Sequence, residues 1–299
     1  MATMPVVAGV DGSAESLRAV EWAALAAQRH GAPLRVVSAP VLPPRMRARH
    51  AVPPTVADQL SGESARALRE AVTRAEEVSS RLLIDAGLLD GPPALAVTAS
   101  GSGALMLVVG ARGAGGFTQL LLGSVSRYAA THAACPVIVV REETSAVHRE
   151  VVVGVRDPQD AAAALDFAFD EAALRGATLV AVHSWNSLPA PALRQADAAL
   201  LAAEADRHLG EALEQWQKKY PGVPVRRDVV HGHTARVLAA YAGRADLVVV
   251  GRHSRGPAVG GIQHAVLSHA HGPIAVVPET LVVPDPAVSA DTVAVAATG

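Results

Sequence analysis

The stretch LMLVVGARGAGGFTQLLLGSVSRYAATHAACPVIVV, residues 105–140, decides how this chain folds. Its first five residues are apolar and are followed directly by glycine, which predicts a short buried strand. A glycine-rich loop comes next, and then a segment with helical character that begins near Gly123 and Ser124. The apolar run 137–140 predicts a second buried strand. The stretch is therefore predicted to form a strand, a glycine loop, a helix and another strand.

The glycine loop and the helix after it predict a phosphate site. Glycines let several backbone N–H groups turn toward one point, and the start of a helix adds a partial positive charge. Ser124 is predicted to be the N-cap of the helix, because its hydroxyl can accept a hydrogen bond from a backbone N–H that the helix leaves unpaired. Glycine-rich loops are common in proteins, so the rest of the chain has to agree with this interpretation.

The sequence contains one unit twice. VVAGVDGS at 6–13 matches VVVGVRDP at 151–158, and ALMLVVG at 104–110 matches ADLVVVG at 245–251. The interval from Gly91 to Gly110 equals the interval from Gly232 to Gly251. We therefore predict two domains of about 145 residues each, an N-terminal half at 1–144 and a C-terminal half at 149–279. Residues 280–299 show no helical period and are predicted to form a disordered tail.

Each copy alternates strands and helices five times, which predicts the α/β class. The first copy has predicted strands at 6–10 and 34–39, a helix at 14–30, a proline-rich loop at 40–62, and a helix at 63–86 that gives way to a short strand around 82–89. Parallel strands need right-handed crossovers, so helices should cover both faces of the sheet. Ligands bind such sheets beyond the carboxyl ends of the strands, where the strand order reverses. If strands 1 and 4 flank that reversal, Asp11 and Gly110 lie side by side.

The spacing Gly110-x2-Gly113-x9-Gly123-Ser124 after a strand resembles the universal stress protein (UspA) family, and its ATP-binding branch in particular. Asp11-Gly12-Ser13 after the first strand adds to this resemblance, which covers residues 4–278 in both halves. It implies two tandem Rossmann-like domains, each a five-stranded parallel sheet in the order 3-2-1-4-5 with flanking helices. It also implies that the domains pair through their edge strands.

The resemblance implies a nucleotide site in the N-terminal half, for ATP with Mg²⁺ or Mn²⁺ carried by its phosphates. No side chain is assigned as a catalytic residue or as a protein ligand of the metal. Folding alone is not expected to explain the glycines and the serine of the phosphate loop. The implied positions are Asp11 on the nucleoside, the backbone near Ala39 facing adenine, Gly110 near the ribose, and Gly113, Gly123 and Ser124 on the phosphates.

The C-terminal half departs from this pattern. Arg156 stands where the first copy has Asp11, and Ser254 stands where it has Gly113. Its loop is four residues shorter, and a glycine pair at 260–261 replaces the glycine–serine pair. A shorter loop with a larger residue cannot wrap a triphosphate in the same way, so we predict weak or absent nucleotide binding. The alternative is an altered anion site formed by Arg252, His253 and Arg255.

The remaining features set limits on function. A net charge of −2 gives no electrostatic argument for nucleic acid or an anionic membrane as a partner. The sequence shows no signal peptide and no apolar run of roughly 18 residues, the length of a membrane span. The single cysteine, Cys135, fits a reducing compartment and is interpreted as a small buried residue. These features predict a cytoplasmic protein.

Histidines crowd the C-terminal half, but no cysteine or carboxylate completes a three- or four-ligand set, and no metal site is predicted. His183 stands where the first copy has Ser38. We interpret it as a core histidine, with a site residue as the alternative.

The apolar strands at 137–140 and 274–277 are predicted to be sheet edges. Exposed apolar edges invite pairing and are normally covered. We therefore expect the two halves to pair there as an intramolecular pseudo-dimer, while the same edges also allow a homodimer of two chains.

Three functions stay open. The first is a regulatory protein of the stress response that binds an adenine nucleotide and acts on an unknown protein partner. The second is a slow ATPase or nucleotidyl-transfer enzyme of the same superfamily, and the third is an interaction scaffold with a vestigial site. No nucleophile elbow, Walker lysine or general base is identifiable, so turnover is expected to be slow or absent.

Overall fold

The computed structural model of the protein describes residues 3–41, 54–113, 122–141, 147–156, 161–185, 195–252 and 261–280. Apart from its first residue, the predicted tail lies outside this part of the chain. The elements of the N-terminal half are β1 (Val6–Val10), α1 (Ala14–His30), β2 (Leu34–Ser38), α3 (Pro54–Val78), β3 (Ile84–Leu88), α4 (Pro93–Ser100), β4 (Met106–Gly110), α5 (Ser124–His132) and β5 (Val137–Val140). Those of the C-terminal half are β6 (Glu150–Gly154), α6 (Ala162–Arg175), β7 (Thr178–Trp185), α7 (Gln195–Lys219), β8 (Val225–His231), α8 (Thr234–Ala242), β9 (Leu247–Arg252), α9 (Gly261–His269) and β10 (Ile274–Pro278).

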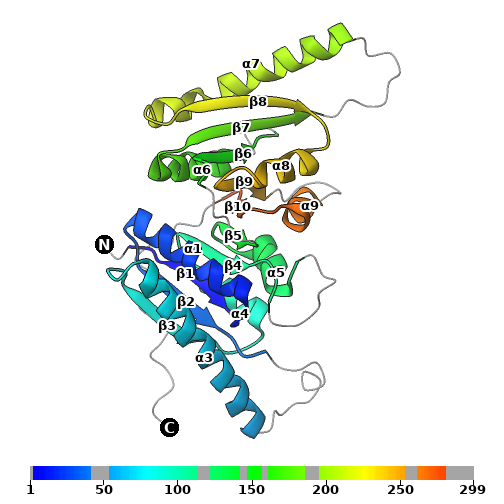
Figure 1. The fold of residues 1–299 in the computed structure, drawn as a ribbon. Helices are drawn as coiled ribbons and strands as arrows, with labels where there is room; N and C mark the ends of the chain where they lie inside the picture. The colour runs from blue at the N-terminus through cyan, green and yellow to red at the C-terminus, as the bar shows by residue number, and fades with distance from the viewer. Residues whose placement is uncertain are drawn as a thin grey trace, which may run out of the picture.

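All these strands form one sheet in the order β3-β2-β1-β4-β5-β10-β9-β6-β7-β8. Within each half the strands are parallel and follow the predicted order 3-2-1-4-5. The halves meet where β5 and β10 pair antiparallel, with Ile274 opposite Val139 and Val276 opposite Val137. The expected pairing of the halves through their fifth strands is therefore confirmed, and Figure 1 shows the two halves stacked along the common sheet.

Helices cover both faces of the sheet. One apolar cluster joins α1, α3, α6 and α7 to one face, and a second joins α4, α5, α8 and α9 to the other (Figure 1). Successive residues of β1 alternate between the clusters, so that Val6 and Ala8 belong to the first and Val7 to the second. A strand buried on both faces has to be apolar throughout, which explains the uniform apolar runs in the sequence.

α1 runs as predicted from Ala14 to His30 because both of its ends carry clear signals. The hydroxyl of Ser13 accepts a hydrogen bond from the N–H of Ser16 at 3.2 Å, and Gly31 ends the helix in the left-handed conformation at φ 60°. The buried face is rich in alanine, which lets the helix approach the sheet closely. A Cβ on Gly110 would lie only 2.9 Å from the backbone carbon of Glu15, so the start of α1 fits against the end of β4 because residue 110 is glycine.

The region between β2 and α4 corrects the expected boundaries. α3 begins at Pro54, inside the predicted loop at 40–62, and ends at Val78, before the predicted end at 86. Proline is well tolerated in the first turn of a helix, where its missing N–H has no intrahelical partner. The prediction of a loop at residues 54–62 was therefore wrong, because Pro54 starts the helix and does not prevent it. The short strand expected around 82–89 is confirmed as β3.

Polar contacts also join the halves. In α6, Glu171 accepts hydrogen bonds from Arg175 on its own helix and lies 2.8 Å from Nε2 of His30 at the end of α1. In addition, Arg141 donates to the carbonyl of Leu267 in α9 at 2.8 Å. Within the described ranges no helix is long and apolar enough to cross a membrane.

Candidate functional site

The ends of β1 and β4 place the predicted site residues together. The two strands are parallel neighbours, with Gly9 opposite Val109, so the segments that follow them emerge side by side. A Cβ on Gly113 would collide with Oδ2 of Asp11, which shows how closely the glycine loop approaches the carboxylate. Ala39 follows β2, the strand next to β1, and is buried. The predicted juxtaposition of Asp11 and Gly110 at this end of the sheet is confirmed.

Asp11 is held by the turn that leads into α1. Its Oδ1 accepts hydrogen bonds from the N–H of Ser13 at 3.0 Å and from the Ser13 hydroxyl at 2.6 Å. Gly12 lies at φ 81°, a conformation that side chains disfavour, which accounts for glycine in the middle of the turn. The N–H of Asp11 also donates to the hydroxyl of Ser16 at 3.3 Å. The carboxylate is thus oriented before any ligand arrives.

An ion pair fixes the start of the glycine loop. Glu15, in the first turn of α1, accepts hydrogen bonds from the backbone N–H of Arg112 at 2.6 Å and from its guanidinium at 2.6 and 2.8 Å. Glu15 is buried, whereas the Arg112 side chain is about half exposed. The sequence did not predict this pair, because the two residues lie 97 positions apart and neither is one of the glycines that define the motif.

The end of the loop is fixed at the carbonyl of Ala111. It accepts hydrogen bonds from the N–H of Gly123 at 2.7 Å and from the hydroxyl of Ser126 at 2.9 Å. The prediction that Ser124 caps α5 is wrong: Gly123 is the N-cap, and Ser124 is the exposed first residue of the helix. A Cβ on Gly123 would lie 3.2 Å from the oxygen of Ala111, a tight contact that a side chain at the cap could make only if its neighbour moved slightly.

Packing therefore explains two of the three residues that folding was not expected to explain. Gly113 makes room for Asp11, and Gly123 makes room for Ala111. No contact among the described residues accounts for Ser124, and it begins a helix whose first N–H groups have no intrahelical acceptor. These N–H groups and the partial positive charge of the helix start suit an anion.

Among the described residues, the surroundings of the loop offer no metal site of their own. Within the described ranges, no group of three histidine, cysteine or acidic side chains could hold a metal ion. The acidic groups nearest the loop, Asp11 and Glu15, are engaged with Ser13 and Arg112. The residues present thus fit a nucleotide whose metal is carried by the phosphates.

In the C-terminal half, the residues at the end of β9, the counterpart of β4, make contacts that the N-terminal half does not show among the described residues. Arg252, which was considered for an altered anion site, donates instead to the carbonyl of Ala133 in the N-terminal half at 2.6 Å. Burial holds the pKa of its guanidinium below the ordinary value. The other residues of that alternative, His253 and Arg255, lie outside the described part of the chain, as do Ser254 and Gly260. Gln263 in α9 donates to the carbonyl of Gly251 at 3.0 Å and so attaches the helix to the strand end.

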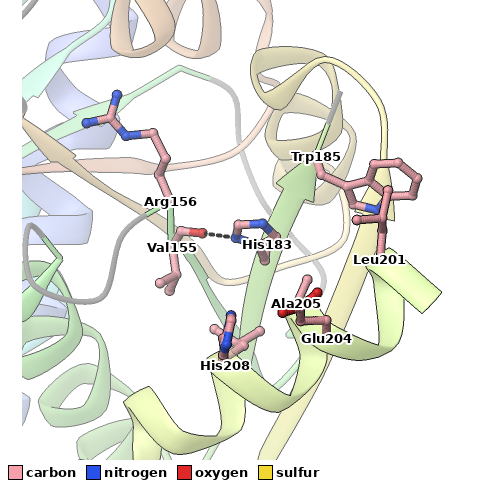
Figure 2. A pocket seen from close by; sticks show the side chains of 9 residues that line it. Val155, Arg156, His183, Trp185, Leu201, Glu204, Ala205 and His208 are labelled. Atoms are coloured by element: carbon pink, nitrogen blue, oxygen red, sulfur yellow. Dashed lines mark hydrogen bonds between the residues drawn. The ribbon is translucent and has the colours of Figure 1, made fainter. Parts of the chain in front are cut away.

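A cavity of about 520 Å³ opens at the carboxyl ends of β6 and β7, beneath α7 (Figure 2). His183 was interpreted as a core histidine, but it is half-buried and lines this cavity, with its Nδ1 2.9 Å from the carbonyl oxygen of Val155. The lining residues are Val155, Arg156, His183, Trp185, Leu201, Glu204, Ala205, His208 and Leu209.

Cys135 is expected to resist thiol reagents in the folded protein. It is only 4% exposed, and burial raises the pKa of its thiol to about 11. At about pH 8 only about one molecule in a thousand would carry the reactive thiolate. Titration with a chromogenic disulfide reagent should therefore give a slow reaction in buffer and a fast reaction of one thiol in denaturant. A fast reaction in buffer would contradict this assignment.

Comparison with known proteins gives a consistent result. The sequence model of the Universal stress protein family matches residues 3–141 and again residues 148–278. A universal stress protein of Mycobacterium tuberculosis is 35% identical over 287 residues, which cover 91% of this chain and 96% of the relative. A second one from the same organism is 32% identical and covers 93% and 98%. The crystal structure of a universal stress protein from Archaeoglobus fulgidus has the same fold, with a TM-score of 0.67 at 18% identity over 92% of this chain and 96% of that one.

Proposed function

This chain belongs to the universal stress protein family, and from that premise we propose that its N-terminal half binds an adenine nucleotide, ATP with Mg²⁺, and that the protein is a nucleotide-dependent regulator in the stress response. The observation that carries the proposal is the contact between Asp11 and the glycine loop at Gly113. A carboxylate suited to a nucleoside and a loop suited to phosphates thus lie within one nucleotide's reach of each other.

Each residue of the proposed site has a distinct task. Asp11 accepts hydrogen bonds from the nucleoside, and the backbone at Ala39 faces the base. Gly110 lies near the ribose. Gly113 and Gly123 lie against the phosphates, and Ser124 together with the first turn of α5 donates to them. A Mg²⁺ or Mn²⁺ carried by the phosphates would neutralise part of their negative charge.

Regulation would follow from a change of the surface where the nucleotide binds. Both ends of the loop are attached to the sheet, one through Arg112 and Glu15 and the other through Gly123 and Ala111. A nucleotide between them changes the surface at this end of the protein, and a partner that reads this surface would sense the nucleotide. The alternative functions, slow ATP hydrolysis or a vestigial site, are outcomes of the following experiment.

The test is to denature freshly purified protein and identify any released nucleotide by chromatography. Calorimetric titration with ATP and magnesium then measures the affinity of nucleotide-free protein. ATP or ADP in the extract, or saturable binding at one site per chain, supports the proposal. The absence of both would show that the site is vestigial. Multiple-turnover release of phosphate would instead identify an enzyme.

Replacing Arg112 with alanine is expected to weaken ATP binding about tenfold, or about 1.4 kcal/mol, and to leave adenosine binding unchanged. The change removes a cation beside the phosphates and leaves the buried carboxylate of Glu15 without its counter-charge, with only the backbone N–H of residue 112 still donating to it. Both effects disfavour an anion. Arg74→Ala, which breaks an exposed pair with Glu21, is the matched control. Equal losses for ATP and adenosine would show that Arg112 acts on the fold and not on the phosphates.

A further inference from the structure

One wall of the cavity in the C-terminal half is formed by β7, which is longer than its counterpart β2 in the N-terminal half. β2 ends at Ser38, whereas β7 continues beyond the matching residue, His183, to Trp185. The extra residues pair with β8, so that Trp185 lies opposite His231. The longer strand pair brings His183 and Trp185 to the same face of the sheet, because they are two residues apart. Figure 2 shows both side chains on β7, with residues of α7 facing them.

The cavity walls suit a flat apolar molecule. Its deepest residues, Val155 and Leu209, are each 3% exposed, and Ala205 and Leu201 extend the apolar surface along α7. The indole ring of Trp185 is fixed by an edge-to-face contact with His231, with 4.7 Å between the ring centroids. An aromatic ligand gains from such a ring beyond the area it buries. The volume of about 520 Å³ lies within the usual range of small-molecule sites.

His183 supplies one hydrogen-bond acceptor. A backbone carbonyl can only accept, so the contact between Nδ1 of His183 and the oxygen of Val155 requires the proton to sit on Nδ1. In the neutral ring Nε2 then carries a lone pair and no hydrogen. A ligand that donates one N–H or O–H to Nε2 satisfies it, and a ligand without a donor leaves it unpaired.

The C-terminal half is a poor host for an adenine nucleotide. The backbone at Ser184, which matches Ala39, is part of the ladder with β8, where Ser184 lies opposite Val230. The position of the nucleoside-binding carboxylate is occupied by Arg156. The side chain of Arg252, directly after Gly251, donates a hydrogen bond to the carbonyl of Ala133 in the N-terminal half. Among the described residues, the positions that match Asp11 and Ala39 therefore differ from those proposed to read the nucleoside and the base, while Gly251 still matches Gly110.

We propose that the cavity between β7 and α7 binds a flat, phosphate-free aromatic or heteroaromatic molecule that donates one N–H or O–H to His183. Indole and phenol represent this class. The site is separate from the nucleotide site of the N-terminal half, and each half of the protein would then respond to a different kind of ligand.

The test uses matched pairs of small molecules on the full chain, at about pH 8. Indole is compared with 1-methylindole, and phenol with anisole, by calorimetry. The donor of each pair is expected to bind about five- to tenfold more tightly, the size of one hydrogen bond. No binding of either donor at millimolar concentration, or equal affinities within both pairs, would overturn the proposal.

Two variants locate the site. His183→Phe keeps a flat apolar wall but removes the acceptor, so the preference for indole over 1-methylindole should fall to about one while both still bind. Trp185→Ala should weaken both about tenfold. Glu214→Gln, on an exposed part of α7, is the matched control and should leave the preference unchanged.

Saturating ATP with magnesium separates this proposal from the function proposed for the N-terminal half. ATP should not displace indole from the cavity, whether or not the N-terminal half binds ATP. Competition that persists in a Gly113→Ala variant would identify the cavity as a second nucleotide site and would overturn the assigned ligand class. Failure of ATP to bind anywhere would leave the result with indole unaffected.

Discussion

Replacing Glu171 with alanine is expected to lower the free energy of unfolding by about 3–5 kcal/mol, because it leaves two basic side chains without their shared carboxylate in a buried place. Glu171 is 1% exposed and accepts bonds of 2.7 and 3.0 Å from Arg175. Nε2 of His30 lies 2.8 Å from its other oxygen, and the guanidinium of Arg175 covers the ring of Trp22 at 5.3 Å. Denaturant titration followed by circular dichroism measures the loss.

The same carboxylate predicts how stability depends on pH. Burial alone would raise the pKa of Glu171, but the hydrogen bonds and charges of His30 and Arg175 outweigh it and hold the pKa below its ordinary value. The folded state therefore binds this proton less readily than the unfolded chain does. The contribution of Glu171 is present above about pH 4.3, the ordinary value for glutamate, and is lost as the pH falls further. Glu171→Gln should flatten this part of the stability profile.

A matched exposed pair provides the control. Glu214 pairs with Lys218 at 3.5 Å on α7, with both side chains more than half exposed. Glu214→Ala should cost less than about 0.5 kcal/mol, as exposed pairs of this spacing do. A loss below about 1 kcal/mol for Glu171→Ala would show that the contact between α1 and α6 is not a principal connection between the halves.

Replacing Gly113 with alanine is expected to weaken ATP binding at least tenfold. The new methyl group would occupy the space of Oδ2 of Asp11, so either the loop or the carboxylate has to move. Each movement separates the group proposed to hold the nucleoside from the groups proposed to hold the phosphates. Calorimetric titration with ATP and magnesium measures the effect.

Two further variants sharpen this prediction. Gly87→Ala in β3 adds a methyl group that meets nothing within 4 Å, and ATP binding should stay unchanged. The double variant Asp11→Ala with Gly113→Ala removes the collision. If Asp11 contacts the nucleoside, the double variant still binds ATP poorly even though its loop has room. Recovery of ATP binding in the double variant would show that Asp11 is a packing neighbour only.

Much of the fold was predictable because it depends on local patterns. The uniform apolar runs gave the bounds of β1 and β5 correctly, and Ser13 and Gly31 marked the ends of α1. The internal repeat then predicted the same strand order in each half. The error at α3 arose because proline acts as a breaker inside a helix but not in its first turn, and only the three-dimensional position distinguishes the two.

The candidate site was predictable only in outline. The expected neighbourhood of strands 1 and 4 placed Asp11 beside the loop correctly, while nucleotide binding itself stays a prediction. The contacts that attach the loop join residues far apart in the sequence, such as Glu15 and Arg112. At the cap of α5, Gly123 lies so close to the carbonyl oxygen of Ala111 that an added Cβ would make a tight contact, and no local sequence pattern encodes this distance. The cavity at His183 required the extra length of β7, which becomes meaningful only when β8 lies beside it.

Because β5 and β10 belong to one chain, their antiparallel pairing does not depend on the protein concentration. Two separate domains that meet edge to edge form a dimer that falls apart on dilution, because their encounter depends on how much protein is present. In this chain the linker between the halves sets an effective concentration that dilution cannot lower. The paired sheet therefore persists when the protein is scarce, and each half always has the same unequal neighbour. Such a fixed pair frees one half to change its ligand chemistry while the other retains its own.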